Sequence, residues 1–254
     1  MDSEGSRALY KLSYIETVFK DLIDGKVKAI IPFKKEGAKS RLGHFLTESE
    51  REEFALRMLI DVLGAIAESK LEEVEIITTC PKSELIEELK LHEGVDLISR
   101  LTVRVREDKR GLNELLNDVI GKEEEPVLII MADIPLATPR SINELIEHEE
   151  EVVIAPGRKG GTNALFLRRP YDFSVSYYGI SCAEHVEMAK RRKLSYAVYD
   201  SFFISTDIDE IDDLIEVLIH GKGFSAAYLR SKGIVLHVDK NLKTRALIAV
   251  SYTH

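Results

Sequence analysis

The chain has 254 residues, and its 35 Lys and Arg against 44 Asp and Glu give a formal net charge of −9. Hydrophobic residues make up 44% and charged residues 31%, which is typical of a globular protein with a sizeable core. The acidic balance argues against a nucleic-acid-binding surface. The longest purely apolar run, Val127–Ala132, is far shorter than the ~20 residues of a membrane-spanning helix.

The compartment follows from the N-terminus and the cysteines. The first residues, MDSEGSRALYK, lack the apolar segment of a signal peptide. Cys80 and Cys182 show neither metal-binding spacing nor a disulfide framework. We therefore expect a cytoplasmic protein with no membrane or nucleic-acid partner.

The first half of the chain alternates short apolar segments with helical patterns. Segments 27–33, 74–79, 126–133 and 151–156 are predicted strands of a sheet covered on both faces. The clearest helix starts at the capping box Thr47–Glu50, and shorter helices are expected at 112–120 and 141–148. This order predicts one α/β domain with a mixed, mostly parallel sheet.

The second half has a different texture. Segment 164–178 is predicted to be a strand or hairpin and 181–192 a helix, and an acidic helix start is expected at 209–213. Segments 234–238 and 246–253 alternate in hydrophobicity, as an edge strand or a dimer element would. We expect a helical extension at residues 1–26, with an amphipathic stretch at 9–23, then a domain at 27–238 and a tail at 239–254.

A cationic loop follows the first predicted strand. Ligands of open α/β sheets gather at the carboxyl ends of the strands, so this loop is placed to bind one. A polyphosphate suits its charges, although the spacing is not that of a P-loop and a solvated loop is the alternative. Its four cations are Lys34, Lys35, Lys39 and Arg41.

Two further strand ends carry carboxylates. Asp133 follows the apolar run 127–132, where it could bind Mg²⁺ together with substrate phosphates or cap the next helix. Asp207 and Asp209 share a side if the chain is extended there, so they could bind a metal. The alternative places Asp209 in the acidic first turn of a helix.

A glycine-rich turn precedes a hydroxyl and an amide. Gly160 and Gly161 would let the backbone approach a small anion, with Thr162 and Asn163 as donors, or would simply form a flexible turn. No histidine has metal-ligand spacing, and no nucleophile elbow is present, so covalent hydrolase chemistry has no support.

These motifs, in this order, resemble one family, the archaeal 2-phospho-L-lactate guanylyltransferases of deazaflavin coenzyme F(420) biosynthesis. The resemblance extends from residue 30 to beyond residue 220. The matching stretches are IPFKKEGAKSRL, EREEFALRM, GLNELL, PVLIIMADIPL, GGTNALF, YYGIS, His185, and YDSFFISTDIDE leading into LIEVLIHGKG.

The resemblance implies a Rossmann-like nucleotidyltransferase domain related to glycosyltransferase-A folds. It implies transfer of GMP from the co-substrate GTP to 2-phospho-L-lactate with Mg²⁺, in a homodimer. Lys39, Arg41 and Asp133 would be catalytic. Lys34 and Asn113 would join Lys39 and Arg41 in binding the nucleotide. Thr162, Gly179 and Ser181 would hold the acceptor, and Asp133, Asp207 and Asp209 the metal.

Three alternatives remain open at this point. The same transfer to phosphoenolpyruvate or 3-phosphoglycerate is the nearest, because those acceptors also carry a carboxylate and a phosphate. A molybdopterin or sugar nucleotidyltransferase is more distant, since the loop 32–42 departs from their LxGGxSxRxGxxK pattern. A non-catalytic nucleotide-binding protein is the remotest.

Overall fold

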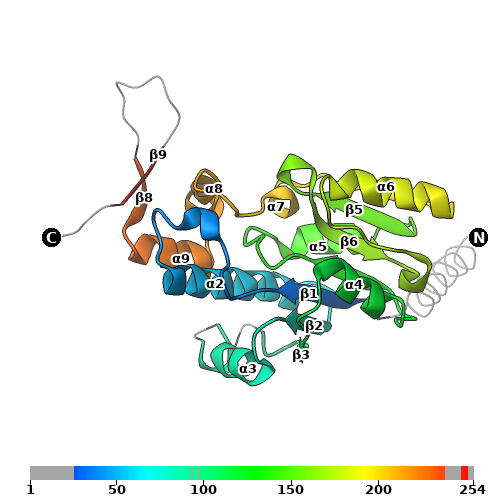
Figure 1. The fold of residues 1–254 in the computed structure, drawn as a ribbon, viewed down its shortest axis with the longest axis horizontal. Helices are drawn as coiled ribbons and strands as arrows, with labels where there is room; N and C mark the ends of the chain where they lie inside the picture. The colour runs from blue at the N-terminus through cyan, green and yellow to red at the C-terminus, as the bar shows by residue number, and fades with distance from the viewer. Residues whose placement is uncertain (1–25, 93, 97, 238–246, 251–254) are drawn as a thin grey trace, which may run out of the picture.

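A seven-stranded sheet organises the part of the chain that the computed structural model describes, residues 26–92, 94–96, 98–237 and 247–250 (Figure 1). The strand order is β3-β2-β1-β4-β6-β5-β7. β6 pairs antiparallel with β4 and β5, and the other pairings are parallel. The strands are β1 (Lys28–Phe33), β2 (Glu73–Thr78), β3 (Thr102–Glu107), β4 (Val127–Ile130), β5 (Val152–Pro156), β6 (Thr162–Leu167) and β7 (Tyr196–Val198). The expected mixed, mostly parallel sheet is confirmed.

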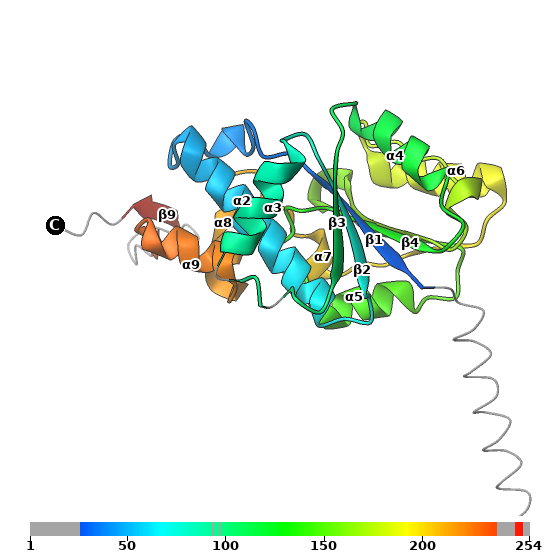
Figure 2. The same ribbon diagram turned by 90° about the horizontal axis from the view of Figure 1, so that it is seen from below.

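Side chains that alternate along the strands pack into two hydrophobic clusters, one on each face of the sheet. Ala29 and Ile31 of β1 pack in the cluster of α2, whereas Ile30 between them packs with α4 and α6. Figure 2 shows α4 and α6 on one side of the sheet and α2, α3 and α5 on the other. The helices are α2 (Glu48–Ala67), α3 (Lys82–Leu91), α4 (Leu112–Ile120), α5 (Pro139–Ile146), α6 (Ser181–Arg192), α7 (Phe202–Ser205), α8 (Asp213–His220) and α9 (Phe224–Ser231).

Most of the expected elements are present with shifted ends. The strands at 27–33, 74–79 and 151–156 and the helices at 112–120 and 181–192 are confirmed within a residue or two. The strand expected at 126–133 ends at Ile130, and the helix expected at 141–148 begins at Pro139 because Thr138 caps it. Thr47 and Glu50 make both bonds of the capping box at the start of α2.

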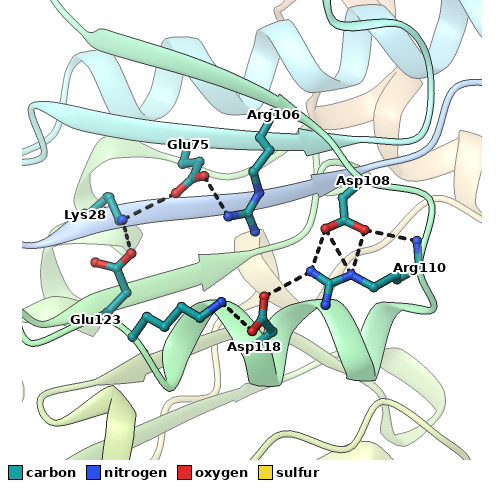
Figure 3. A network of polar contacts seen from close by, with 8 residues as sticks. Lys28, Glu75, Arg106, Asp108, Arg110, Asp118 and Glu123 are labelled. Atoms are coloured by element: carbon teal, nitrogen blue, oxygen red, sulfur yellow. Dashed lines mark hydrogen bonds and ion pairs between the residues drawn. The ribbon is translucent and has the colours of Figure 1, made fainter.

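Five elements were not predicted from the sequence: β3, β7, α3, α7 and α9. β3 alternates apolar with charged residues and presents Arg104 and Arg106 on one face. The Arg106 guanidinium lies 3.6 Å from Glu75 of β2, and the Glu75 carboxylate lies 3.4 Å from Lys28 of β1 (Figure 3). Charges on a sheet face are therefore compensated across three adjacent strands, a pattern that a search for apolar strands overlooks.

The region after β6 differs from one expectation. Residues 168–178 form a 3-10 turn at Pro170–Asp172 and otherwise no helix or strand, so the hairpin alternative for 164–178 is wrong and the strand alternative is confirmed.

The last described strands, β8 (Ile234–His237) and β9 (Leu247–Val250), pair antiparallel as a separate two-stranded sheet. Both segments are therefore strands, although neither lies at the edge of the seven-stranded sheet, and β9, within the tail expected at 239–254, pairs with a strand of the main domain. The amphipathic stretch expected at 9–23 lies outside the described residues. Among the described residues, none of the helices has both the length and the apolar composition needed to span a bilayer.

Candidate active site

A cavity of about 620 Å³ lies where β1, β2, β3 and β4 end. Its wall combines apolar residues, such as Met58 and Leu115, with charged side chains from the loops after the strands. In a chain of net charge −9, this lining carries more cations than carboxylates. The cations are Lys34, Lys39, Lys109 and Arg110, and the carboxylates are Asp108 and Asp133. A cavity of this size and charge suits a polyanion with an apolar or aromatic part.

Lys39 joins two of the predicted carboxylates. Its ammonium lies 2.6 Å from Asp133 and 2.8 Å from Asp209, and its side chain is only 10% exposed. Burial alone would lower the pKa of Lys39, but Asp133 and Asp209 outweigh it and raise that pKa. The backbone of Lys39 is left-handed, at φ 51°, which is unusual for a residue with a side chain and typical of functional sites. Two of the residues predicted to be catalytic, Lys39 and Asp133, are therefore in direct contact.

The chain holds the carboxylates together through its backbone as well. The Ile208 amide donates to the Asp133 carbonyl at 3.0 Å, which brings the segment of Asp207 and Asp209 to the end of β4. The Asp209 side chain pairs with Lys39, and α8 begins only at Asp213, so Asp209 does not lie in a helical first turn. Thr138, and not Asp133, caps α5.

Asp207 and Asp209 differ in the direction of their pKa shifts. Although burial opposes ionisation, Lys39 lowers the pKa of Asp209. The pKa of Asp207 is raised, first by burial and then, against the hydrogen bond from Asn163, by the negative charge of Asp133. Within the described residues, Asp207 forms no ion pair with a Lys, Arg or His side chain, and a bound cation would stabilise its ionised form.

The donor set fits a hard divalent cation. Carboxylate oxygens are the ligands that Mg²⁺ prefers, usually one or two of them together with substrate phosphates. Within the described residues, no three His, Cys, Asp or Glu side chains are close enough to hold an ion by themselves. Asp133, Asp207 and Asp209 therefore suit a metal that arrives with its phosphates better than a metal held by the protein alone.

The other predicted phosphate ligands are placed differently. Lys34 is exposed and lines the cavity. Arg41 is 65% exposed, lies outside the cavity lining, and pairs with Glu210 at 3.3 Å beside Asp209. Lys34 and Lys39 thus share one cavity, and Arg41 lies next to the carboxylates.

Thr162 and Ser181, two of the three residues predicted to hold the acceptor, form a separate, buried cluster, whereas Gly179 is exposed. The hydroxyls of Thr162 and Ser181 are 3.2 Å apart, and each residue is 3% exposed. Thr162 also contacts Nδ1 of the buried His185 at 2.9 Å. Gly179 precedes Ser181 with a φ of 57°, a conformation that favours glycine. The structure therefore brings Thr162 and Ser181 together and shows His185 as a third member that histidine spacing alone did not reveal.

Asn113 lies beside the cavity and outside its lining. Its side-chain oxygen accepts a hydrogen bond from the Tyr177 amide at 2.7 Å, which connects α4 to the segment before Gly179. Gly111 and Leu112, its neighbours in sequence, line the cavity. Asn113 thus links the wall of the cavity to the acceptor cluster.

Sequence reasoning missed Asp108 and Arg110, which line the cavity just beyond β3. Arg110 lies 2.7 Å from Asp108 and 3.0 Å from Asp118 of α4 (Figure 3). The hydrogen bond from Arg110 lowers the pKa of Asp108 to about 2, so its carboxylate stays ionised. Their position directly after a strand would have indicated a role at the site, but β3 itself was not predicted from the sequence.

Asn163, predicted as a donor to a small anion, donates instead to the chain itself, and its close contact with Gly157 explains the glycine-rich turn. The Asn163 amide donates to Asp207 at 3.2 Å and to the Ile204 carbonyl at 2.9 Å. A Cβ atom on Gly157 would lie 2.3 Å from the Asn163 side-chain oxygen. Glycine at this position therefore leaves the space in which Asn163 orients Asp207, so the turn is more than a flexible connection.

Solved structures resemble this fold at low sequence identity. A putative nucleotide-diphospho-sugar transferase from Desulfovibrio desulfuricans superposes with a TM-score of 0.64 at 18% identity, covering 81% of this chain and 94% of that one. A nucleotidyl transferase from Methanothermobacter superposes with a TM-score of 0.56 at 15% identity, covering 82% and 99%. The fold is therefore that of nucleotidyltransferases.

Sequence relatives are much nearer. The 2-phospho-L-lactate guanylyltransferase of Methanosarcina mazei is 43% identical over 206 residues, which cover 81% of this chain and 93% of the relative. That of Methanocella arvoryzae is 43% identical over 228 residues, covering 87% and 96%. A family model described as "Guanylyl transferase CofC like" matches residues 27–251. The chain belongs to this CofC-like guanylyltransferase family.

Proposed function

We propose that this protein transfers GMP from GTP to (2S)-2-phospholactate, forming lactyl-2-diphospho-5′-guanosine and pyrophosphate. The observation that carries the proposal is the Lys39 ammonium between Asp133 and Asp209 at the edge of a cation-lined cavity. Such a site concentrates charge where phosphates would react, and family membership supplies the substrates. We place the reaction in deazaflavin coenzyme F(420) biosynthesis for the same reason.

The step is an in-line displacement at phosphorus. An oxygen of the phospholactate phosphate forms a bond to the α-phosphorus of GTP, and the bond to the bridging oxygen breaks. Pyrophosphate leaves with that electron pair. Because the attacking phosphate is already ionised, no general base is needed, and catalysis consists of positioning and charge neutralisation.

The chain's own cations have distinct tasks in this proposal. Lys34 and Lys39 hold the phosphates of GTP from the first loop, and Arg41 approaches them from beside Glu210. Asn113 seats the nucleotide indirectly, by fixing the segment at Tyr177 against α4.

The acceptor and the metal have ligands of their own. The acceptor carboxylate is bound by Thr162, Ser181 and the backbone at Gly179. Asp133, Asp207 and Asp209 would hold Mg²⁺, which when bound neutralises phosphate charge.

Two broader properties complete the proposal. We expect a homodimer because the family resemblance implies one; the two-stranded sheet β8–β9 itself packs against α8 and α9 of the same chain. Light scattering of the purified protein measures this directly. Cys80 and Cys182 are free thiols, which fits a reducing cytoplasm.

The test is pyrophosphate release with GTP and Mg²⁺, offering 2-phospho-L-lactate, phosphoenolpyruvate or 3-phosphoglycerate in parallel. We expect release with 2-phospholactate and its loss in Asp133→Asn. The matched control is Asp172→Asn, a carboxylate of similar exposure paired with Arg169 outside the cavity.

Each outcome decides between the alternatives. Preference for another acceptor would keep the nucleotidyl transfer and change the substrate. Absence of release with every acceptor and every nucleotide, from folded protein, would refute the enzyme and favour a nucleotide-binding role.

A further inference from the structure

His185 is a fully buried histidine next to the predicted acceptor residues. It lies on α6, and the rings of Phe173 and Tyr177 are 6.0 and 5.0 Å from its own. Burial lowers its pKa to about 4, so the imidazole is neutral near pH 7. A neutral imidazole has one nitrogen that donates a hydrogen bond and one that accepts.

The backbone decides which nitrogen carries the proton. The Ser176 amide lies 3.0 Å from Nε2 of His185. Because a backbone N–H can only donate, Nε2 must accept and Nδ1 must carry the proton. Nδ1 therefore donates to the Thr162 hydroxyl oxygen, 2.9 Å away.

This fixed tautomer leaves one hydroxyl proton unused. Thr162 and Ser181 carry two hydroxyl protons, and one of these makes the 3.2 Å bond between them. His185 takes up neither, because its Nδ1 donates. Within the described residues, neither hydroxyl donates a hydrogen bond to any other acceptor. The remaining proton can therefore be donated to a ligand. With the opposite tautomer, Nδ1 would accept it.

The position of this hydroxyl pair points to a ligand of the active site. Thr162 is the first residue of β6, and the carbonyl of the next residue, Asn163, accepts a hydrogen bond from Met131 at the end of β4. The Asn163 side chain contacts Asp207. Thr162 is thus adjacent in sequence to the residue that contacts Asp207. Because Thr162 and Ser181 are almost completely buried, a hydrogen bond from them to an anionic oxygen would be strengthened.

We infer that His185 is a positioning residue that keeps one hydroxyl proton of the Thr162–Ser181 pair available for an anionic oxygen of the acceptor. This inference rests on the proposed function for the identity of the acceptor. His185 does not touch the ligand. By donating to the Thr162 oxygen, His185 leaves the proton of that hydroxyl group free to be donated elsewhere.

Two amide substitutions separate the functions of the two ring nitrogens. In His185→Asn, the side-chain NH₂ can take the place of Nδ1 and donate to Thr162. In His185→Gln, the side-chain oxygen can take the place of Nε2 and accept from Ser176. We expect His185→Asn to keep the KM for the acceptor within about 3-fold of the wild type. We expect His185→Gln to raise it by about 10-fold or more, with the KM for GTP unchanged in both.

A role confined to packing predicts a different result. Equal changes in both variants, or changes in the KM for GTP as large as those for the acceptor, would overturn the inference. Thr162→Ser and Thr162→Val provide a second measurement, because only the first keeps the hydroxyl. His185→Gln should have little further effect on the acceptor KM in the Thr162→Val background, and a full additive effect would also overturn the inference.

The tautomer can be measured without turnover. Nitrogen-15 NMR of the imidazole in the full-length wild-type protein should show the proton on Nδ1. A proton on Nε2 would overturn the inference, whatever the enzyme does. If the tautomer is as expected but no acceptor reacts in the wild type, the proposed function has failed and the hydrogen-bond assignment stands.

Discussion

The ammonium of Lys39 lies 2.6 Å from the carboxylate of Asp133, although 94 residues separate the two in sequence. One residue comes from the loop after β1 and the other from the end of β4, and these strands are neighbours in the sheet. This ion pair joins the phosphate loop to the proposed metal ligands, so it is the natural place to begin testing the site.

Replacing Lys39 by Met should lower turnover by roughly 30-fold to several thousand-fold, since it leaves charged partners in a partly desolvated cluster. Steady-state pyrophosphate release measures the loss. Lys35→Met is the control, because Lys35 is similarly buried and paired with Glu84 and Glu88 but lies outside the cavity lining. Equal losses in both variants would contradict a specific role for Lys39.

The same variant tests competition between Lys39 and a divalent cation. Without the ammonium, Asp133 and Asp209 should bind Mg²⁺ more readily in the absence of nucleotide. A ligand that binds only the folded state raises the melting temperature, so Mg²⁺ should raise the Tm of Lys39→Met more than that of the wild type. Identical shifts in thermal melts would argue that these carboxylates are not metal ligands.

Gly157→Ala should impair activity through Asn163. The added methyl group would lie 2.3 Å from the Asn163 oxygen, so the amide must move and its bond to Asp207 weakens. We expect about a 10-fold loss of kcat, corresponding to about 1.4 kcal/mol. Gly161→Ala is the matched control, because its methyl group would meet no atom within 4 Å. Wild-type kcat in Gly157→Ala would show that Asn163 does not orient Asp207.

Thr47→Ala should destabilise the fold without touching the site. It removes the hydroxyl that accepts from the Glu50 amide at the start of α2, a change that typically costs about 1 kcal/mol. Urea denaturation should show this loss, with KM unchanged. Ser49→Ala, an exposed hydroxyl in the same turn, is the comparison. A loss no larger than that of Ser49→Ala would mean that the capping box contributes little.

The stability of the fold should fall as the pH drops from about 6.5 to about 4, in part because of His185. Its pKa in the folded state is lowered to about 4 by burial, so the unfolded chain binds more protons in this range. The contribution is present in full above the unfolded pKa and is lost as the pH falls to the folded value, in total about 3 kcal/mol. Urea denaturation at several pH values measures it.

The slope should be smaller in His185→Gln and unchanged in His220→Gln, an exposed histidine. If His185→Gln keeps the wild-type slope, other groups cause the acid sensitivity.

The sequence predicts those parts of the fold and of the site that are recognisable from runs of buried apolar residues. β1, β4 and β5 are apolar on both faces, and the rule that ligands gather at strand ends brought Lys39 and Asp133 to one place. The antiparallel direction of β6 leaves no mark in composition, since only the neighbouring strands define it. Asp108 was missed because β3 carries charges that Glu75 compensates from another strand. The role of His185 depends on the Ser176 amide, which only the folded chain brings within reach.

The direction of β6 has a consequence for how the protein can be modified. β6 is antiparallel to β4 and β5, so its first residues lie at the carboxyl ends of those strands, where the site is. The turn 157–161 therefore fixes the positions of Thr162 and Asn163. Changing the length of that turn would shift both residues at once. The connection 121–126, between α4 and β4, lies at the amino-terminal end of β4, away from the site. A fluorescent label or a surface tether attached there would leave the site undisturbed.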